Sequence, residues 1–415
     1  MTPVAIFFIQ SLLVVSLPYA AWRFGGLRQV MPLVVIQIVL GVLVGPSVLG
    51  HLAPDVWQLM FSTASLNGLS GTAWLAVVLF AFLTGLHLQP QEIRQLGGSF
   101  AVVTLASVLV PAMVGMGLGW GLIVWYPEAL SEDLSQWHFI VAIGLLCSVT
   151  ALPVLGSILR ESGLIAHRLG RYALGVAAIS DALLWISLAL LLVNLPRPHV
   201  SFISAGWMPV LGLVYMGIMF FVVQPLLARF IKNGDGFKES GLVLVCTTIF
   251  ASALIAELVG LHSTLGGFIA GVIIPRAAAR VIIERLEPLT VVVLLPFFFT
   301  LVGMSITVDA SSSNLLEISL LAIALSMLGK IGGTAMAARW SGESWKCSLA
   351  LGVLLQTKGM MEVVVLSVLK EAGIISPMIF SAMLFMALIT TAATTPLLRW
   401  IGGKDAPWDP KTTAH

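Results

Sequence analysis

Long apolar stretches recur along nearly the whole of this sequence, and they constrain its fold more than any other feature. Each stretch is about 18–25 residues long, enough for a helix to cross the hydrocarbon layer of a membrane, which is about 30 Å thick. In that layer every backbone N–H and C=O must be satisfied within the protein, so only helices and closed barrels can span it. Because apolar runs of this length are typical of helices, the chain is predicted to be an all-α membrane protein.

We expect thirteen transmembrane helices, separated by short loops that hold charged residues, Pro or Gly. Only 10% of the residues are charged, against about 25% in soluble domains. No basic stripe suggests nucleic-acid binding, no Cys spacing suggests a metal site, and no nucleophile–base pair or cofactor motif suggests an enzyme. The expected helices cover approximately residues 4–22, 31–49, 71–88, 98–125, 138–160, 170–193, 206–230, 240–259, 262–279, 289–308, 315–338, 345–369 and 377–400.

The distribution of Lys and Arg along the chain predicts its orientation in the membrane. Seventeen of the 21 basic residues fall in the loops after odd-numbered helices, at the helix ends beside those loops, or at the C-terminal end. Only Arg197 and Lys370 fall in the loops after even-numbered helices. Since basic loops stay on the cytoplasmic side, we expect the N-terminus outside and the C-terminus in the cytoplasm. The short loops fit a multi-pass protein of a prokaryotic inner (cell) membrane.

Ionisable residues inside the expected helices are candidates for function, because burying them in a membrane is costly. Asp181 lies near the middle of 170–193, in GVAAISDALLWISL. We interpret it as a carboxylate that binds a cation or a proton; a structural acid hydrogen-bonded to a neighbouring helix is the alternative. Lys330, near the middle of 315–338, is expected to pair with Asp181 or to release a proton itself. A purely structural ion pair between two helices is the alternative for Lys330.

Two expected helices carry polar interruptions near their middle. In 138–160, Pro153 lacks a backbone donor and disfavours helix at Leu152, while Ser148 and Thr150 supply hydroxyls. Backbone carbonyls freed at such a break can bind a cation; an ordinary proline kink is the alternative.

The second interruption, in 345–369, is Gln356-Thr357-Lys358-Gly359. Lys358 and Glu362 are four residues apart and share a helical face, so they are predicted to neutralise each other; a direct part in the transport chemistry is the alternative.

The positions of the two interruptions predict an internal repeat. If the seventh helix is a linker, helices 1–6 and 8–13 form two halves of opposite orientation, and each half has its break in its fifth helix. Interrupted helices at matching positions of inverted repeats mark a transporter's substrate site. Helices 5 and 12 are therefore expected to cross at mid-membrane, within reach of Asp181.

Seven segments along about residues 1–400 resemble the monovalent cation:proton antiporters. The branch in question holds bacterial sodium/proton antiporters, potassium efflux antiporters and plant cation/proton exchangers. The segments are MPLVVIQIVLGVLVGPSVLG, LFAFLTGLHL, SVTALPVLGSIL followed by Ser180-Asp181, GLHSTLGGFIAGVIIPR, PFFFTLVGMSI, the Gly-Lys and Gly-Thr pairs around Lys330, and QTKGMMEVVVLSVLKEAGI followed by FMALITTAATTPLL.

The resemblance implies a division of labour between parts of the chain. It implies a core transport domain that slides against a dimerisation domain like an elevator, a homodimer in lipid, and a role in pH homeostasis. No cofactor is implied. The corresponding segments are dimerisation domain 1–95 and 239–310, core domain 96–195 and 311–403, linker helix 196–238, and a polar cytoplasmic tail 404–415.

These residues predict exchange of Na⁺ or K⁺ for H⁺, with Asp181 holding one or the other. Ser148, Thr150 and Ser180 are expected to help bind the ion. Electrogenic members of the family carry two adjacent carboxylates, whereas this chain has Ser180 beside Asp181, so electroneutral exchange is expected. A charge-moving cycle stays open if Lys330 also releases a proton.

Other classes of function remain open from the sequence. A cation channel or uniporter would also place polar breaks at mid-membrane but would need no titrating carboxylate. An organic-anion transporter would use helix N-termini, although the buried Asp181 argues against anions. A non-transporting regulatory relative is the third alternative.

Overall fold

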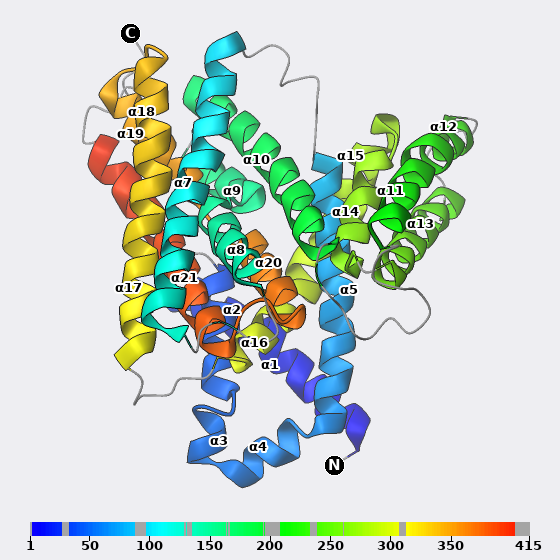
Figure 1. Ribbon diagram of the computed structural model, residues 1–415. Coiled ribbons are helices and arrows are strands. Elements are labelled where there is room, and N and C mark those ends of the chain that lie inside the picture. Colours follow the sequence, from blue (N-terminus) through cyan, green and yellow to red (C-terminus); the bar gives the residue numbers. More distant parts are fainter. Residues whose placement is uncertain are drawn as a thin grey trace. The chain divides into compact units, whose positions relative to one another are not determined.

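The computed structural model describes residues 2–26, 33–87, 97–127, 130, 135–162, 164, 167–193, 195, 208–232, 239–259, 261–306 and 313–402. All regular structure in these residues is helical (Figure 1). Ten helical runs are long and apolar enough to cross a membrane, and three shorter apolar helices occur at Gln136–Ser148, Ser263–Ile273 and Trp345–Leu355. The predicted all-α membrane fold is therefore confirmed.

The chain divides into two compact units, each built from two separate stretches of sequence. The first unit contains Met1–Leu88 and Leu192–Ile306, and the second contains Gln89–Leu191 and Thr307–His415. The second unit holds most of the segments that were expected to form a core domain. We describe each unit by itself.

The first unit consists of two helical groups. The N-terminal group is α1 (Pro3–Phe24), α2 (Leu33–Val44), α3 (Leu49–Leu52), α4 (Pro54–Met60) and α5 (Thr63–His87). The second group contains α11 (Met208–Ile218), η4 (Met219–Val223), α12 (Gln224–Lys232), α13 (Glu239–Leu258), α14 (Ser263–Ile273), α15 (Arg276–Pro288), η5 (Leu289–Leu294) and α16 (Leu295–Met304).

Two glycine contacts hold the first unit together in a reciprocal pattern. Helix α2 packs on α16 and α5 packs on α14. A Cβ on Gly41 or Gly303 would lie 2.1 Å from a carbonyl oxygen of the facing helix, and one on Gly85 or Gly271 would lie 2.2 or 2.0 Å from such an oxygen. Only Gly allows backbones to approach so closely. Each half of this unit thus contributes one glycine to each of two equivalent contacts.

The second unit contains the interrupted helices. Its first stretch is α7 (Gly97–Trp125), α8 (Gln136–Ser148), α9 (Leu152–Glu161) and α10 (Arg168–Val193). Its second stretch is α17 (Ser313–Met327), η6 (Leu328–Gly332), α18 (Gly333–Trp340), α19 (Trp345–Leu355), α20 (Met360–Glu371) and α21 (Pro377–Gly402). In Figure 1 the long helices α7, α10 and α17 run along the height of this unit, with α8, α9 and α20 among them.

The predicted helix boundaries around 262–279 are wrong. The segment 262–279 was expected to be one helix, but α14 ends at Ile273 and a continuous helical run extends from Arg276 to Met304. Pro275 is the N-cap of this run, and prolines at a helix start are tolerated because their missing N–H has no partner there anyway. Arg280, which was assigned to a loop, is therefore helical and pairs with Glu284 at 3.0 Å.

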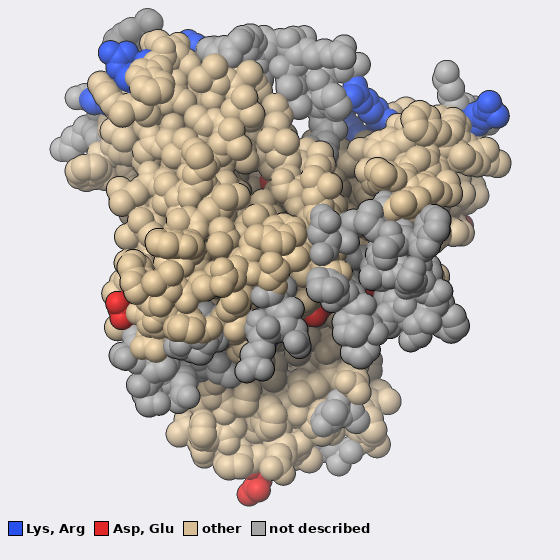
Figure 2. Space-filling view, in the orientation of Figure 1, with Lys and Arg blue, Asp and Glu red and all other residues tan. Residues whose placement is uncertain are grey.

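The face of the molecule shown in Figure 2 matches that of a protein that lies in lipid. Figure 2 shows few charged side chains over the described part of the chain, and the visible Lys and Arg of the second unit gather at the end where α18 and α19 meet. Several basic residues that carry the orientation argument lie outside the described residues, namely Arg28, Arg94, Arg197, Lys238, Lys404 and Lys411, as does the predicted tail 404–415. The orientation stays a prediction.

Candidate functional site: a crossing of two broken helices

The first break separates α8 from α9. Helix α8 ends at Ser148, the next residue Val149 is extended (φ −54°, ψ 141°), and α9 begins at Leu152. The break predicted within 138–160 is therefore present, at 149–151, but Leu152, where helix was expected to be disfavoured, is already the first residue of α9. Pro153 falls in the first turn of α9, where a proline costs no intrahelical hydrogen bond.

The second break, at 356–359, lies where the polar interruption was predicted. Helix α19 ends at Leu355, and α20 begins at Met360 after Gly359. Gly359 has φ 63° and ψ −140°, a conformation that residues with a Cβ rarely adopt. A Cβ at this position would also lie 2.6 Å from the side chain of Val154. Both the backbone conformation and the packing therefore require glycine.

The two breaks are bonded directly to each other. The Ala151 amide donates to the Thr357 carbonyl at 2.7 Å, and the Thr150 hydroxyl donates to the Leu355 carbonyl at 2.9 Å. Both bonds use groups that lack a helical partner at the break, which would otherwise be costly to bury. The helices α8–α9 and α19–α20 are thus fixed as a crossing, in which Thr150 has a defined role.

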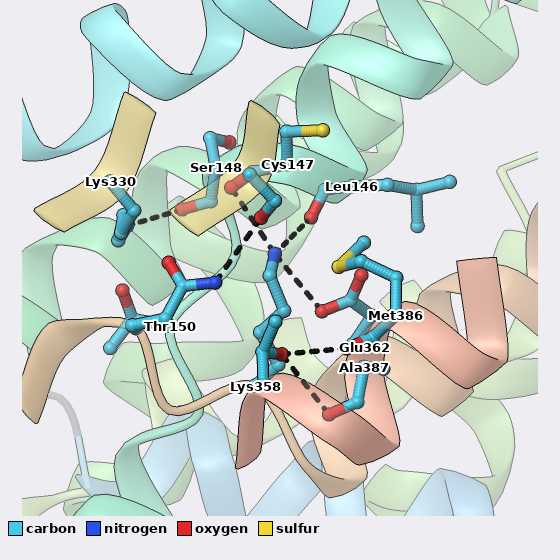
Figure 3. A network of polar contacts seen from close by, with 12 residues as sticks. Leu146, Cys147, Ser148, Thr150, Lys330, Lys358, Glu362, Met386 and Ala387 are labelled. Atoms are coloured by element: carbon cyan, nitrogen blue, oxygen red, sulfur yellow. Dashed lines mark hydrogen bonds and ion pairs between the residues drawn. The ribbon is translucent and has the colours of Figure 1, made fainter. Parts of the chain in front are cut away.

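Two lysines bind the C-terminal end of α8 (Figure 3). Lys330 Nζ donates to the Ser148 carbonyl at 2.6 Å. Lys358 Nζ donates to the Leu146 carbonyl at 2.6 Å and to the Cys147 carbonyl at 3.2 Å. The last carbonyls of a helix have no intrahelical partner and carry the negative end of its dipole. Two cations at this end therefore satisfy and stabilise the break.

The local backbone places Lys330 at the crossing. It lies in a single π turn, Leu328–Gly332, between α17 and α18, and such wide turns are frequent at functional sites. Gly333, in the next turn, faces α7 closely, since a Cβ there would lie 2.6 Å from the Val110 side chain. This contact accounts for the glycine in the Gly333-Thr334 pair, one of the two pairs around Lys330 noted in the sequence.

Asp181, on α10, is completely buried. In the described part of the chain, neither of its carboxylate oxygens has a hydrogen-bond partner. Its electrostatic neighbours are Lys330 and the backbone amide of Leu152, in the first turn of α9, where the helix dipole favours an anion. The expected direct pair with Lys330 is replaced by the bond from Lys330 to Ser148. The Asp181 oxygens therefore retain their lone pairs for a ligand.

The other two predicted hydroxyls bond within their own helices. Ser148 Oγ donates to the Leu145 carbonyl at 2.8 Å, and Ser180 Oγ donates to the Val176 carbonyl at 2.8 Å. A hydroxyl that donates its proton still has oxygen lone pairs that can accept a hydrogen bond or bind a cation. Ser148 ends α8 at the crossing, and Ser180 precedes Asp181 on α10.

Lys358 and Glu362 form the predicted ion pair, with a Nζ–Oε2 separation of 3.2 Å. Both side chains are fully buried. A buried charge without its partner is strongly destabilising, so the two residues depend on each other. Among the described residues of this unit, the four buried charges (Asp181, Glu362, Lys330 and Lys358) sum to zero when all are ionised.

The contribution of Thr391 was missed by the sequence analysis. Its Oγ1, on α21, accepts from the amides of Lys358 at 3.3 Å and Gly359 at 3.0 Å, and donates to the Ala387 carbonyl at 2.7 Å. Thr391 therefore caps α20 from another helix. Asp181 holds the corresponding place at the start of α9. The adjacent threonines of FMALITTAATTPLL were visible in the sequence, but their partner was not.

Gln356 completes the polar contacts of the second break. Its Nε2 donates to Ser326 Oγ at 3.2 Å. Among the described residues, no group of three or more His, Cys, Asp or Glu side chains is arranged to hold a metal ion.

The sequence and fold were compared with known proteins. Residues 11–400 match the family described as "Sodium/hydrogen exchanger, transmembrane". Cation/H(+) antiporter 17 of Arabidopsis thaliana is 34% identical over 90% of this chain and 45% of its own length. K(+)/H(+) antiporter 1 of Saccharomyces cerevisiae is 30% identical over 96% of this chain and 47% of its own length. The chain thus spans somewhat less than half the length of these two relatives.

A solved structure has a similar fold. The sodium proton antiporter MjNhaP1 from Methanocaldococcus jannaschii, determined at pH 8, superposes with a TM-score of 0.62. The match covers 96% of this chain and 97% of the other, with 13% sequence identity.

Proposed function

The chain belongs to the sodium/hydrogen exchanger family of multi-pass membrane proteins, and from that premise we propose that it exchanges a monovalent cation for H⁺ across the membrane. The observation that carries the proposal is Asp181, a fully buried carboxylate without a hydrogen bond in the described part of the chain. A carboxylate in this position must bind a proton, a cation or a charged side chain to stay buried.

In the proposed mechanism Asp181 holds either a proton or a cation, but never both. The bound cation would be coordinated by Asp181, by hydroxyl oxygens of Thr150, Ser148 and Ser180, and by carbonyls of the non-helical segment 149–151. The N-terminal end of α9 stabilises the ionised carboxylate after one ion has left and before the other binds. Lys330 adds an attraction to Asp181 while its hydrogen bond goes to Ser148.

Counting buried charges supports electroneutral exchange. With all four charges ionised the crossing is neutral, and either one H⁺ or one monovalent cation at Asp181 gives it the same net charge of one. Lys330 and Lys358 are both engaged as caps of α8, which favours their keeping their protons through the cycle. One cation then exchanges for one proton without net charge movement.

The proposed topology has thirteen spans, two inverted repeats and the N-terminus outside. The reciprocal glycine contacts of α2–α16 and α5–α14 support the repeats in the first unit. In the second unit, support comes from the two breaks and from Asp181 and Thr391 at corresponding helix starts. Residues 196–238 would then be the linker between the halves.

We further propose elevator-like transport by a homodimer in a cell (inner) membrane, with a role in pH homeostasis. All residues of the crossing belong to the second unit, which supports movement of the site as one body. The first unit would then supply the dimerisation domain.

The names of the two relatives refer to cations in general and to K⁺, and that of the solved structure refers to sodium. We propose Na⁺ or K⁺ as the substrate. The test uses purified protein in liposomes with a pH-sensitive dye inside. Addition of Na⁺, K⁺ or Li⁺ outside should alkalinise an acidic lumen, and Asp181→Asn should abolish the response. Cation flux without proton movement would indicate a channel or uniporter, and no flux at all would indicate a regulatory relative.

A further inference from the structure

A buried polar seam runs between the helical run α17–η6–α18 and helix α19. One side presents Ser326, Lys330 and Thr334, which follow one another at intervals of four residues. The other side presents Gln356, Gly352 and Ser348, at the same interval in the opposite direction. Every one of these residues is buried. We call this set the hydroxyl seam.

Two contacts fix the register of the hydroxyl seam. Gln356 Nε2 donates to Ser326 Oγ at 3.2 Å, and a Cβ on Gly352 would lie 2.7 Å from the Ile331 carbonyl oxygen. The helices are antiparallel, since α18 and α19 are joined by the short turn 341–344. From Gly352, one more turn of helix toward the connection 341–344 reaches Ser348, which is therefore level with Thr334.

The hydroxyls of Thr334 and Ser348 are unusual for this unit. Neither has a hydrogen-bond partner among the described residues, and the same holds for Gln356 Oε1. Other buried hydroxyls, such as those of Thr104 and Ser381, donate to a carbonyl of their own helix. Buried polar atoms are generally satisfied, and ordered water fills polar sites that offer it two to four partners. Thr334 and Ser348 together form such a site at one level of the seam, and Gln356 Oε1 adds an unsatisfied acceptor two helical turns away.

The seam reaches toward water at one end and toward the charged crossing at the other. Beyond Thr334, one helical turn leads to Ala338 and then to the turn 341–344, where Gly342 and Ser344 are exposed. The inner end is Lys330, which bonds to Ser148 at the crossing and attracts Asp181. At Gly352 the two backbones approach too closely for a hydrated cation to pass, whereas a proton relay needs only oxygens at hydrogen-bond distance.

We propose that the hydroxyl seam holds ordered water and carries protons between the α18–α19 turn and Asp181. Each water or hydroxyl oxygen accepts a proton from one neighbour and releases its own to the next, and the last water, beside Lys330, passes its proton to Asp181 while the Lys330 ammonium keeps its own. The transfer ends with a neutral Asp181 carboxyl, and it runs in reverse when a cation displaces that proton. Delivery of the proton to Asp181 rests on the proposed function, whereas the presence of water in the seam is independent of it.

Entry of water is tested with hydrogen peroxide, a probe close to water in size. In a background with Cys147, Cys246 and Cys347 replaced by Ala, Ser348→Cys is compared with Ala350→Cys, a fully buried position of the same helix outside the seam. Peroxide converts a thiolate and H₂O₂ to a sulfenate and water, which dimedone labelling detects. Ser348→Cys should react roughly tenfold faster, because thiolate formation needs solvation. Equal rates would overturn the proposal.

Proton transfer is tested in liposomes with the double variant Thr334→Val/Ser348→Ala. Its matched control is Thr104→Val/Ser381→Ala, which removes two buried hydroxyls that bond to their own helices. We expect the seam variant to lose roughly tenfold in turnover, to keep its cation KM within about twofold, and to show a larger ratio of rates in H₂O and D₂O than the control.

Turnover and isotope ratio equal to those of the control would overturn the seam as a proton route, even with water present. Loss of cation binding together with turnover would also overturn it, since the seam would then be structural. Retention of exchange by Asp181→Asn would instead refute the proposed function, and the peroxide rates would still decide whether the seam is hydrated.

Discussion

The Lys330 ammonium donates a 2.6 Å hydrogen bond to the carbonyl oxygen of Ser148, the last residue of α8. This contact joins the π turn of one half of the second unit to the broken helix of the other. It also leaves the Asp181 carboxylate, which Lys330 attracts from a greater distance, free of a direct ion pair. The lysine thus supports the crossing while the aspartate remains open to a proton or a cation.

Replacing Lys330 is therefore expected to weaken the fold. Lys330→Met leaves the buried Ser148 carbonyl without this donor, which costs about 1–3 kcal/mol, so the midpoint of thermal unfolding in detergent should fall by several degrees. Lys330→Gln, which keeps a shorter donor, should fall less. Asp181→Asn serves as control, because its carboxylate accepts no hydrogen bond in the described structure. An unchanged midpoint for Lys330→Met would contradict the capping role.

Lys358 and Glu362 should show strong energetic coupling. Glu362→Gln leaves a buried, unpaired ammonium, for which a loss of about 3–5 kcal/mol is expected. The double variant Lys358→Met/Glu362→Leu should lose much less than the sum of the two single variants. The measurement is a double-mutant cycle on unfolding in detergent micelles, with the exposed pair Arg280 and Glu284 as control, for which the coupling should be below about 1 kcal/mol. Additive losses at the buried pair would disprove the coupling.

Gly359 should tolerate no side chain. Gly359→Ala meets two penalties, a positive φ and a Cβ 2.6 Å from the Val154 side chain. Gly373 is a matched control, because it has φ 73° but nothing within 4 Å of an added Cβ. We expect Gly373→Ala to lose about 1 kcal/mol of stability from backbone strain and Gly359→Ala to lose about 2–4 kcal/mol. Adding Val154→Ala should recover part of the second loss. Equal effects of the two glycine variants would argue against the close approach.

Thr391 is expected to act through its oxygen. Thr391→Val keeps the shape but removes the acceptor of two amides, so it should destabilise the protein by about 1–2 kcal/mol, as loss of a helix cap does. Thr391→Ser should retain most of the stability. Thr390→Val is the control, because that hydroxyl donates only to carbonyls of its own helix. The prediction fails if the valine variants at 390 and 391 unfold alike.

Exchange at one carboxylate should not respond to membrane voltage. The crossing carries the same net charge with a proton or a monovalent cation at Asp181. The two half-cycles therefore move equal charge in opposite directions, and no net charge crosses the membrane in a full cycle. The exchange rate is measured in liposomes with a potential of either sign set by a lipophilic ion gradient. A rate that changes steeply with voltage would indicate that Lys330 or Lys358 also releases a proton.

The sequence predicted the membrane fold because apolar length is a local property. It also placed the second break at Gln356–Gly359, since polar residues and glycine there interrupt an apolar helix directly. It predicted the first break within 138–160 but not where that break ends, because a proline is compatible with a first helical turn as well as with an interruption. Pro275 likewise lies at the start of a new helix, whereas the prediction continued one helix through it to residue 279.

The contacts of the site depend on residues far apart in the sequence. Lys330 was expected to meet Asp181, but the distance of 182 positions between Lys330 and Ser148 conceals their bond. The cap that Thr391 provides to Gly359 is hidden for the same reason. Lys358 and Glu362 were paired correctly, because helical spacing alone places them on one face.

The most direct test of the central claim measures protons released when a cation binds. Purified protein in weakly buffered detergent is titrated with Na⁺ and then with K⁺, while a pH indicator reports protons and calorimetry reports binding. The account predicts up to one proton released per bound cation at a pH where Asp181 is protonated, and neither release nor binding for Asp181→Asn. Cation binding without proton release, or equal release from Asp181→Asn, would contradict the claim that one carboxylate holds either ion.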